Sequence, residues 1–530
     1  MEAQLFLDFA LNLDEIRELE GDFLLVEHEE NPADDLGEAL TVRRGSPELT
    51  PIYVRRLQES FTLSDTLSRL WSLDQVTWDR VSIANYFETG WNNIERGHRT
   101  PFREVQKIFP GSKLKILCHG SRTKIFRCST ARPEQSVPHG FKLSNLEDFS
   151  KVFRFHVESA LRKSEIKGSD LLLSGGIDSG TLAVVGARLG VINDAHTSEL
   201  DNTADESEHD MAAVVASHAN LNLRKHLINP PTDIVHSLTQ LLSVTGSPVS
   251  DIEGLTHFEL LGEVRRFSQS RYLLTGFGAD LTFGGTPWEY PAMAATALRQ
   301  GKLGSFYKIC AAFLSSAGFT GEKKFGDGVV TLIKLMVWSV LPIFVRSNLN
   351  RRLINRKARG CLRFNLPAPD SSRYTGYEGA VIHAGMESAL RQLTAMAKHF
   401  GLSLAHPFES REFLRLSQQC DPAIFAYGTG KYAIRKAVDD LLPRQILDEK
   451  KKIGSPGYVR SISQLWDSQI LDYLDIIRDG RQSVLVDIDK LRHSITSHGL
   501  DEGNFRLLNL VMFEQMVGNC VDKNTSEHSQ

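Results

Sequence analysis

The sequence lacks several features that would assign it to common classes of protein. Its six cysteines in 530 residues include no CxxC pair, which argues against a zinc ribbon or a disulfide scaffold. The net charge of −4 leaves no basic excess, so nucleic acid is not expected as a partner. The first residues lack the basic region and small-residue cleavage site of a secretory signal. These absences favour a protein of the reducing cytoplasm.

Long hydrophobic runs are also missing. The most apolar stretch, 329–345, is interrupted by Lys334 and Pro342 and falls short of the roughly 20 apolar residues that a spanning helix needs. We expect a buried helix there. Weak membrane contact is the alternative, because basic side chains follow the stretch. They are Arg346, Arg351, Arg352, Arg356 and Lys357.

The length and the distribution of polar segments indicate more than one domain. A chain of 530 residues exceeds the size at which a single hydrophobic core keeps growing. Residues 1–130 contain short β-like runs between polar turns, so we expect a small, mostly β domain. A linker rich in Ser, Pro and Gly is expected at 131–146. The main domain then covers 147–521, and 522–530 is expected to be a flexible tail.

Glycine loops follow two apolar runs in the main domain. Leu171–Leu173 ends in Ser-Gly-Gly, and the helical pattern of Thr181–Leu189 comes next. Tyr272–Leu274 ends in a second loop, Gly276–Asp280. Strands that alternate with helices predict a parallel sheet with its ligand site at the carboxyl ends of the strands.

The first loop, Ser174–Ser179, has the properties of a polyphosphate site. Backbone amides and the positive end of a helix dipole meet where a strand passes through glycines into a helix. The hydroxyls of Ser174 and Ser179 can donate hydrogen bonds, and Asp178 could hold a magnesium ion. The loop is neither a Walker A motif nor a Gly-x-Gly-x-x-Gly motif. A tight turn with an Asp-Ser cap is the alternative.

Two further charged residues support a phosphate ligand. Asp280 supplies a second carboxylate at a strand end, and magnesium commonly takes one or two carboxylates together with substrate phosphates. Asp178 and Asp280 therefore form the expected metal pair. Lys431 follows Gly-Thr-Gly at the start of a predicted helix, where a cation opposes the dipole unless an anion is bound. A turn aspartate and a solvated lysine are the structural alternatives.

These motifs, taken in order, resemble the synthetase domain of the asparagine synthetase family. The matching blocks are Leu173-Ser-Gly-Gly-Ile-Asp-Ser179, Asp205-Glu-Ser-Glu208, Pro248-Val-Ser-Asp251, Gly276-Phe-Gly-Ala-Asp280, Phe283-Gly-Gly285, His406-Pro-Phe408, Lys431 to Ala437, and Leu442-Pro443 leading to Lys451. The resemblance implies an α/β fold. It consists of a parallel-sheet synthetase domain, like the adenine-nucleotide alpha hydrolases, preceded by a reduced, mostly β glutaminase-like domain.

The resemblance also implies an ATP-dependent ligase that adenylates a carboxylate and transfers it to an amine, with ATP and Mg²⁺ as cofactors. Catalytic roles fall on Lys431 and Lys451, and the magnesium ligands are Asp178 and Asp280. Lys451 would stabilise charge as the amide forms. The implied nucleotide-binding residues are Ser174, Gly175, Gly176, Asp178, Ser179 and Gly278.

The amino-terminal segments Leu19–Phe23 and Thr100–Gly111 are similar to the family's glutaminase domain. Glutamine-dependent relatives expose a first-residue cysteine, whereas here Glu2 follows Met1 and no cysteine precedes Cys118. Without that nucleophile we expect no glutaminase activity. The amine would then come with the substrate, as in β-lactam synthetases and lasso peptide cyclases. In β-lactam synthetases, a tyrosine at the position of Phe277 pairs with a downstream glutamate and acts as a base. Phenylalanine cannot accept a proton, so the lasso peptide cyclases are the favoured branch.

The expected reaction is macrolactam closure of a precursor peptide, in which the amino terminus attacks an adenylated Asp or Glu side chain. Expected partners are that peptide and a leader peptidase or leader-binding protein. The insertion 286–372 could form a peptide-binding wall or be an ordinary helical elaboration. Alternatives are a small-molecule β-lactam or ammonia-dependent asparagine synthetase, and a noncatalytic binding protein. The general base is unassigned, because His406 and Glu387 both have ordinary structural explanations.

Overall fold

The computed structural model describes most of the chain between Ala3 and Glu527. The described residues are 3–6, 24–30, 38–44, 52–56, 61–72, 75–87, 94–95, 98–108, 113–119, 122–128, 145–162, 167–200, 208–249, 252–283, 290–299, 301–316, 329–330, 333, 336, 360–365, 386–421, 424–425, 431–448, 466–480 and 482–527. Some of them, including Asp280 and the strands before Ile52, are described by their backbone alone.

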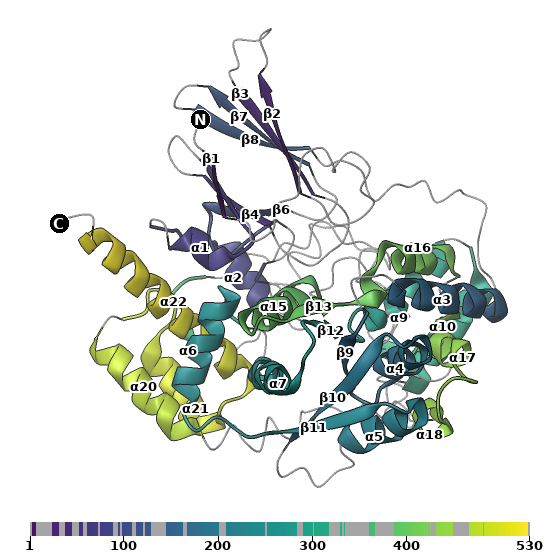
Figure 1. Cartoon of the computed structure of the whole chain (residues 1–530). Helices are drawn as coiled ribbons and strands as arrows, with labels where there is room; N and C mark the ends of the chain where they lie inside the picture. The colour runs from purple at the N-terminus through teal and green to yellow at the C-terminus, as the bar shows by residue number, and fades with distance from the viewer. Residues whose placement is uncertain are drawn as a thin grey trace.

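A five-stranded parallel sheet lies at the centre of the main domain, in the order β11-β10-β9-β12-β13 (Figure 1). Its strands are β9 (Ser169–Leu172), β10 (Ile192–Leu200), β11 (Asn222–Ile228), β12 (Tyr272–Leu274) and β13 (Ser403–Ala405). All pairs of neighbours in it are parallel. The predicted α/β class is therefore confirmed, and the two glycine loops follow adjacent strands, β9 and β12.

Helices cover both faces of this sheet because its strands are apolar on both sides. Leu273 and Leu274 point into two different hydrophobic cores, as alternate residues of a strand must. One core contains α3 (Leu146–Leu161), α4 (Ile177–Leu189) and α5 (Glu208–Ala219). The other contains α6 (Ile234–Thr245), α7 (Glu253–Phe267), α15 (Met386–His399) and α22 (Glu502–Glu527).

The amino-terminal region is mostly β, as the sequence predicts. One sheet has the order β1-β5-β4-β6, and a second, antiparallel sheet has the order β2-β3-β7-β8. Two short helices, α1 (Leu67–Trp71) and α2 (Arg80–Tyr86), accompany them. The strands are β1 (Ala3–Phe6), β2 (Leu24–Glu30), β3 (Glu38–Arg44), β4 (Ile52–Arg56), β5 (Phe61–Ser64), β6 (Val105–Ile108), β7 (Lys113–His119) and β8 (Arg122–Cys128).

This region shares a hydrophobic core with the helices of the main domain. The Trp71 indole donates a hydrogen bond to the carbonyl of Gly246 at 3.3 Å, and the Tyr86 hydroxyl donates to the carbonyl of Val249 at 2.8 Å. The ring of Phe513 on α22 packs edge-on against Trp71. Nearly all of the expected linker, 131–146, lies outside the described residues, so the domain boundaries stay predictions.

The remaining helices lie around these layers. They are α8 (Ala279–Phe283), α9 (Tyr290–Arg299), α10 (Leu303–Ser316), η4 (Pro407–Glu409), α16 (Arg411–Gln419), α17 (Tyr432–Ala437), α18 (Arg444–Asp448), α20 (Asp467–Asp479) and α21 (Ile488–His498). Helix α22 continues into the expected tail at 522–530 and ends at Glu527.

The predicted buried helix at 329–345 lies largely outside the described residues, which include only Val329, Val330, Ile333 and Met336 of that stretch. No helix within the described part of the chain is both long enough and apolar enough to cross a membrane.

Candidate active site

The first glycine loop connects β9 directly to α4. Gly175 has a φ of +73°, and Gly176 is the residue before the first turn of the helix. The helix begins at Ile177, so it includes Asp178 and Ser179 and starts before the helical pattern recognised at Thr181. Gly176 has no side chain to cap the first-turn amides, and the positive end of the helix dipole lies at this loop, an arrangement that suits an anion.

Gly175 is required by packing as well as by its backbone angle. A Cβ atom at this position would lie 2.5 Å from the Cβ of Met211 and 2.6 Å from the backbone nitrogen of Ala212. Both residues belong to α5, which therefore lies directly against the loop. No side chain fits between the loop and α5, and the loop shape is fixed by the fold itself.

The two serines of the loop have different surroundings. Their hydroxyl oxygens lie 3.2 Å apart, and the Ser174 amide donates to the Ser179 hydroxyl at 3.3 Å. Ser179 is buried, whereas Ser174 is exposed. Ser179 thus holds the loop against the helix, and Ser174 is the hydroxyl that solvent or a ligand can reach.

Asp178 and Lys431 form an ion pair at the start of α4. Both side chains are largely shielded, with 13% of Asp178 and 17% of Lys431 exposed. Lys431 has a φ of +64°, uncommon for a residue with a Cβ, and it immediately precedes α17. A backbone in this region costs roughly 1 kcal/mol or more and is often found at functional sites. The fold therefore brings together two of the residues singled out in the sequence.

The second glycine loop touches the first. A Cβ atom at Gly276 would lie 2.7 Å from the amide nitrogen of Ser179 and 3.1 Å from the Cβ of Asp178. Gly278 has a φ of +96°, and a Cβ there would lie 3.0 Å from a carboxylate oxygen of Glu409. The loop is thus held between Asp178 on one side and Glu409 on the other. Nothing in the sequence pattern indicated Glu409.

Two of the predicted residues cannot be placed fully. Asp280 lies in the first turn of α8, two residues after Gly278, but its side chain lies outside the described part. Lys451 lies outside the described residues altogether. Among the side chains that are described, no group of three or more His, Cys, Asp or Glu residues could hold a metal. A magnesium ion that takes one or two carboxylates and nucleotide phosphates suits Asp178 at a helix amino terminus.

Phe277 lies between two imidazoles. Its ring centroid is 6.2 Å from that of His257 on α7 and 6.4 Å from that of His406. The His406 Nδ1 atom lies 2.6 Å from the Thr275 hydroxyl oxygen. Burial lowers the pKa of His406 to about 3, so the imidazole is neutral at ordinary pH.

A second histidine cluster, which no sequence pattern indicated, lies across strands β9, β10 and β11. His196 Nε2 lies 3.1 Å from Asp170 Oδ2, and His196 Nδ1 lies 2.9 Å from His226 Nε2. These residues come from β9, β10 and β11 and are nearly inaccessible. Burial, followed by the neighbouring His196, lowers the pKa of His226 to about 4. Separations of 26 and 30 residues left no local pattern by which to find them.

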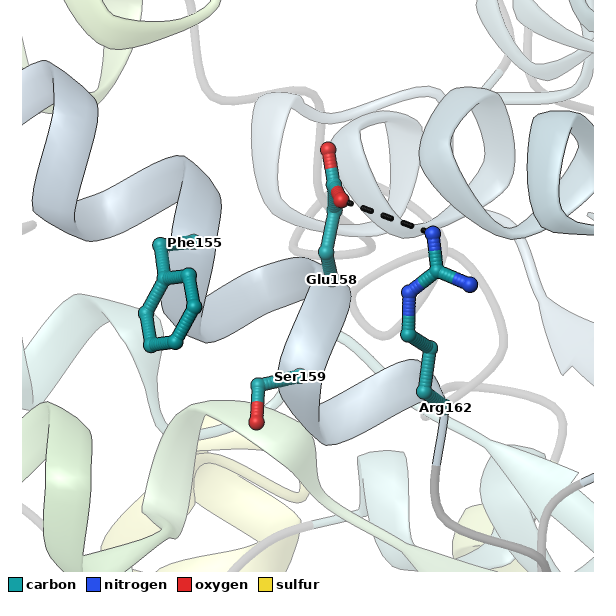
Figure 2. Close-up of a pocket in the computed structure, with 4 residues that line it drawn as sticks. All are labelled: Phe155, Glu158, Ser159 and Arg162. Atoms are coloured by element: carbon teal, nitrogen blue, oxygen red, sulfur yellow. Dashed lines mark ion pairs between the residues drawn. The ribbon is translucent and has the colours of Figure 1, made fainter.

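A shallow hollow of about 300 Å³ lies on α3 (Figure 2), and none of its lining residues belongs to a glycine loop. Phe155, Glu158, Ser159 and Arg162 line it, and Arg162 is 3.7 Å from Glu158. The buried residues of α3, such as Phe153 and Val157, lie on the opposite face of the helix. The hollow is therefore on the outer surface, and its side chains offer no catalytic arrangement.

Comparison with known families gives a match over the whole candidate site. The model of the asparagine synthase family matches residues 157–516, which is more than half of the chain. Both glycine loops, Lys431 and Lys451 lie inside this range. No match was found among curated proteins. Enzymes of the matched family are ATP-dependent ligases that form carbon–nitrogen bonds. The parallel sheet and the two touching glycine loops lie within the matched region. Because the match covers more than half of the chain, the chain belongs to the asparagine synthase family.

Proposed function

We propose that the protein transfers AMP from ATP to a carboxylate, releases pyrophosphate, and joins the acyl group to an amine. Family membership supports ATP-dependent amide-bond formation in general. The observation that carries the finer proposal is the Asp178–Lys431 pair at the amino terminus of α4, beside two glycine loops. This arrangement offers backbone amides, a carboxylate and an ammonium group to one polyphosphate.

We propose a role for each polar and charged side chain singled out at the site. Ser174 and the amides of α4 bind phosphate oxygens, and Asp178 with Asp280 would hold Mg²⁺, which neutralises phosphate charge when bound. When a nucleotide binds, the Lys431 ammonium group would move from the Asp178 carboxylate to nearby phosphate oxygens. Lys451 is proposed to stabilise the negative charge that develops as the amine attacks the acyl adenylate.

For the second substrate we propose a peptide that supplies both the carboxylate and the amine. Phe277 supports this choice, because an apolar ring packed on the core replaces the base expected of a β-lactam synthetase. The insertion helices α9 and α10 also keep large side chains exposed, with Leu303 66% and Tyr307 74% accessible. Such a surface suits contact with a precursor peptide. A leader peptidase or leader-binding protein would deliver it, in a cytoplasmic setting.

The test is pyrophosphate release from Mg-ATP with synthetic peptides that have a free amino terminus and one internal Asp or Glu. We expect peptide-dependent pyrophosphate and a product that has lost one water, seen by mass spectrometry. The matched control is the same peptide with an acetylated amino terminus, which should release pyrophosphate without losing water. Pyrophosphate release only with small carboxylates, or a product that retains the mass of the linear peptide, would contradict macrolactam closure.

A further inference from the structure

His406 lies at the carboxyl end of the sheet, between the last residue of β13 and the first residue of η4. Its neighbour Thr275 follows β12 directly, and the Thr275 amide donates to the carbonyl of Ala405 at 3.0 Å. The Glu409 amide donates back to the His406 carbonyl at 2.9 Å. The backbone on both sides of the imidazole is therefore fixed by hydrogen bonds to ordered residues.

The contacts of Thr275 favour a proton on the Nε2 atom of His406. The Thr275 hydroxyl oxygen accepts a hydrogen bond of 3.4 Å from the Phe277 amide. Within the described residues, the acceptor for its own hydrogen is His406 Nδ1, at 2.6 Å. A neutral imidazole that accepts at Nδ1 carries its hydrogen on Nε2. Because burial holds the pKa of His406 at about 3, the neutral form is the relevant one.

Among the described residues, none accepts a hydrogen bond from the Nε2–H group. The atom is buried, and it has no hydrogen-bond partner in the part of the chain that the structure describes. An unsatisfied buried donor is rare and costs folding free energy, so a ligand that accepts from it removes that cost.

The position of this donor relates it to the glycine loops. Gly276, next to Thr275, lies against Asp178, and Phe277 lies beside the His406 ring. His406 lies beside the second glycine loop, since its Nδ1 atom is 2.6 Å from the Thr275 hydroxyl oxygen, and that loop also contacts Asp178 and Glu409. In the proposed function the activated carboxylate reacts with a phosphate bound near Asp178, and His406 lies beside the loop that contacts Asp178.

We propose that His406 binds the second substrate, with its Nε2–H donating a hydrogen bond to an oxygen of the carboxylate that is activated. This inference rests on the proposed function, since it assigns a residue to the carboxylate of that reaction. It also excludes His406 as the general base. The Nδ1 lone pair already accepts from Thr275, and Nε2 has a hydrogen to give.

The first test examines the imidazole in the full-length protein labelled with ¹⁵N-histidine. The His406 resonances, assigned by their loss in His406→Gln, should show the Nε2–H tautomer from pH 8 down to about pH 5. Adding acetate, the smallest carboxylate probe, should shift the Nε2 resonance of His406 and leave that of His257 in place. A proton on Nδ1, or no shift with saturating acetate, would overturn the proposal.

The second test separates this proposal from the proposed function. With a peptide that supports pyrophosphate release, His406→Phe should raise KM for the peptide about tenfold to a hundredfold, as expected for a lost hydrogen bond to a charged group. KM for ATP should change less than about twofold, and His406→Gln, which keeps a donor near the Nε2 position, should recover most of the loss. If KM for the peptide is unchanged while the wild type turns over, the His406 proposal fails and the proposed function stands. If acetate shifts Nε2 but no carboxylate yields pyrophosphate, the donor stands and the proposed function fails.

Discussion

Two histidine clusters on the same sheet are built in opposite ways. Across β9, β10 and β11 the cluster is closed, because Asp170, His196 and Ser268 pair with one another or with His226. His196 Nε2 donates to Asp170, His196 Nδ1 shares a hydrogen bond with His226 Nε2, and the Ser268 hydroxyl also donates to Asp170. At the carboxyl end, the chain from Phe277 through Thr275 to His406 ends on a donor that no described residue accepts. The closed cluster needs nothing further to be stable, whereas the open one is completed by a ligand.

The same contrast applies to the surrounding charges. Although burial opposes it, hydrogen bonds from His196 and Ser268 hold the pKa of Asp170 below its ordinary value. Asp170 is therefore ionised, and its carboxylate accepts hydrogen bonds from His196 and Ser268 inside the sheet. Asp178 lies at a helix amino terminus, and its lysine partner comes from a segment 253 positions away. A pair at the amino-terminal ends of two helices can rearrange around phosphate more easily than residues on strands held in register.

The largest effect should come from Lys451→Ala, which removes the charge stabilisation proposed for amide formation. We expect product formation to fall about a hundredfold to a thousandfold, as for the loss of one oxyanion donor. ATP binding, measured by calorimetry, should change little. Lys450→Ala is the matched control and should keep near-normal turnover. An unchanged rate in Lys451→Ala would refute the assignment.

Asp178→Asn should weaken magnesium binding. Losing one carboxylate ligand is expected to raise the magnesium concentration for half-maximal pyrophosphate release by about tenfold to a hundredfold. The control is Asp440→Asn, which breaks the more exposed ion pair with Arg154 and should leave the magnesium dependence as it was. Normal turnover at ordinary magnesium would show that Asp178 is not a ligand.

Gly175→Ala tests the loop as a packed element. The new Cβ would press against α5, and overpacking of this kind costs about 1–3 kcal/mol of unfolding free energy. Gly190→Ala serves as its control, because Gly190 also has a positive φ of +64° but has no atom within 4 Å of the added Cβ. Urea denaturation should show the greater loss for Gly175→Ala. Equal losses would mean that backbone strain alone explains the glycine.

The smallest expected effect is on the pH dependence of stability, through His226 of the closed cluster. The pKa of His226 falls from 6.5 to about 4 on folding, so between these values the unfolded chain binds more protons than the folded one. The contribution to stability is complete above about pH 6.5 and is lost as pH falls toward 4, with a slope of at most about 1.4 kcal/mol per pH unit. His226→Gln should flatten this part of the pH–stability curve without changing turnover at pH 7. A variant with unchanged pH dependence would contradict the closed-cluster interpretation.

Local sequence patterns predicted the elements better than the contacts between them. Strand β12 and the loops after β9 and β12 were located by apolar runs that end in glycine, which is a signal within a few residues. That Gly276 touches Asp178, and that Lys431 pairs with it, depends on segments far apart in the chain. Hydrophobic periodicity carries no information about contacts between segments so far apart in the chain. For this reason the sequence did not indicate Glu409 or the Asp170 cluster.

The shared core of the amino-terminal region has a consequence for how the enzyme can be divided. Trp71, Trp78 and Phe102 surround the Phe513 ring of α22, so these side chains complete the packing of a helix inside the matched family region. A protein cut before Leu146 would leave that face of α22 in water. The segment that contains α1 and the Trp78–Phe102 bridge therefore covers part of the core of the matched family region, whether or not it takes part in catalysis.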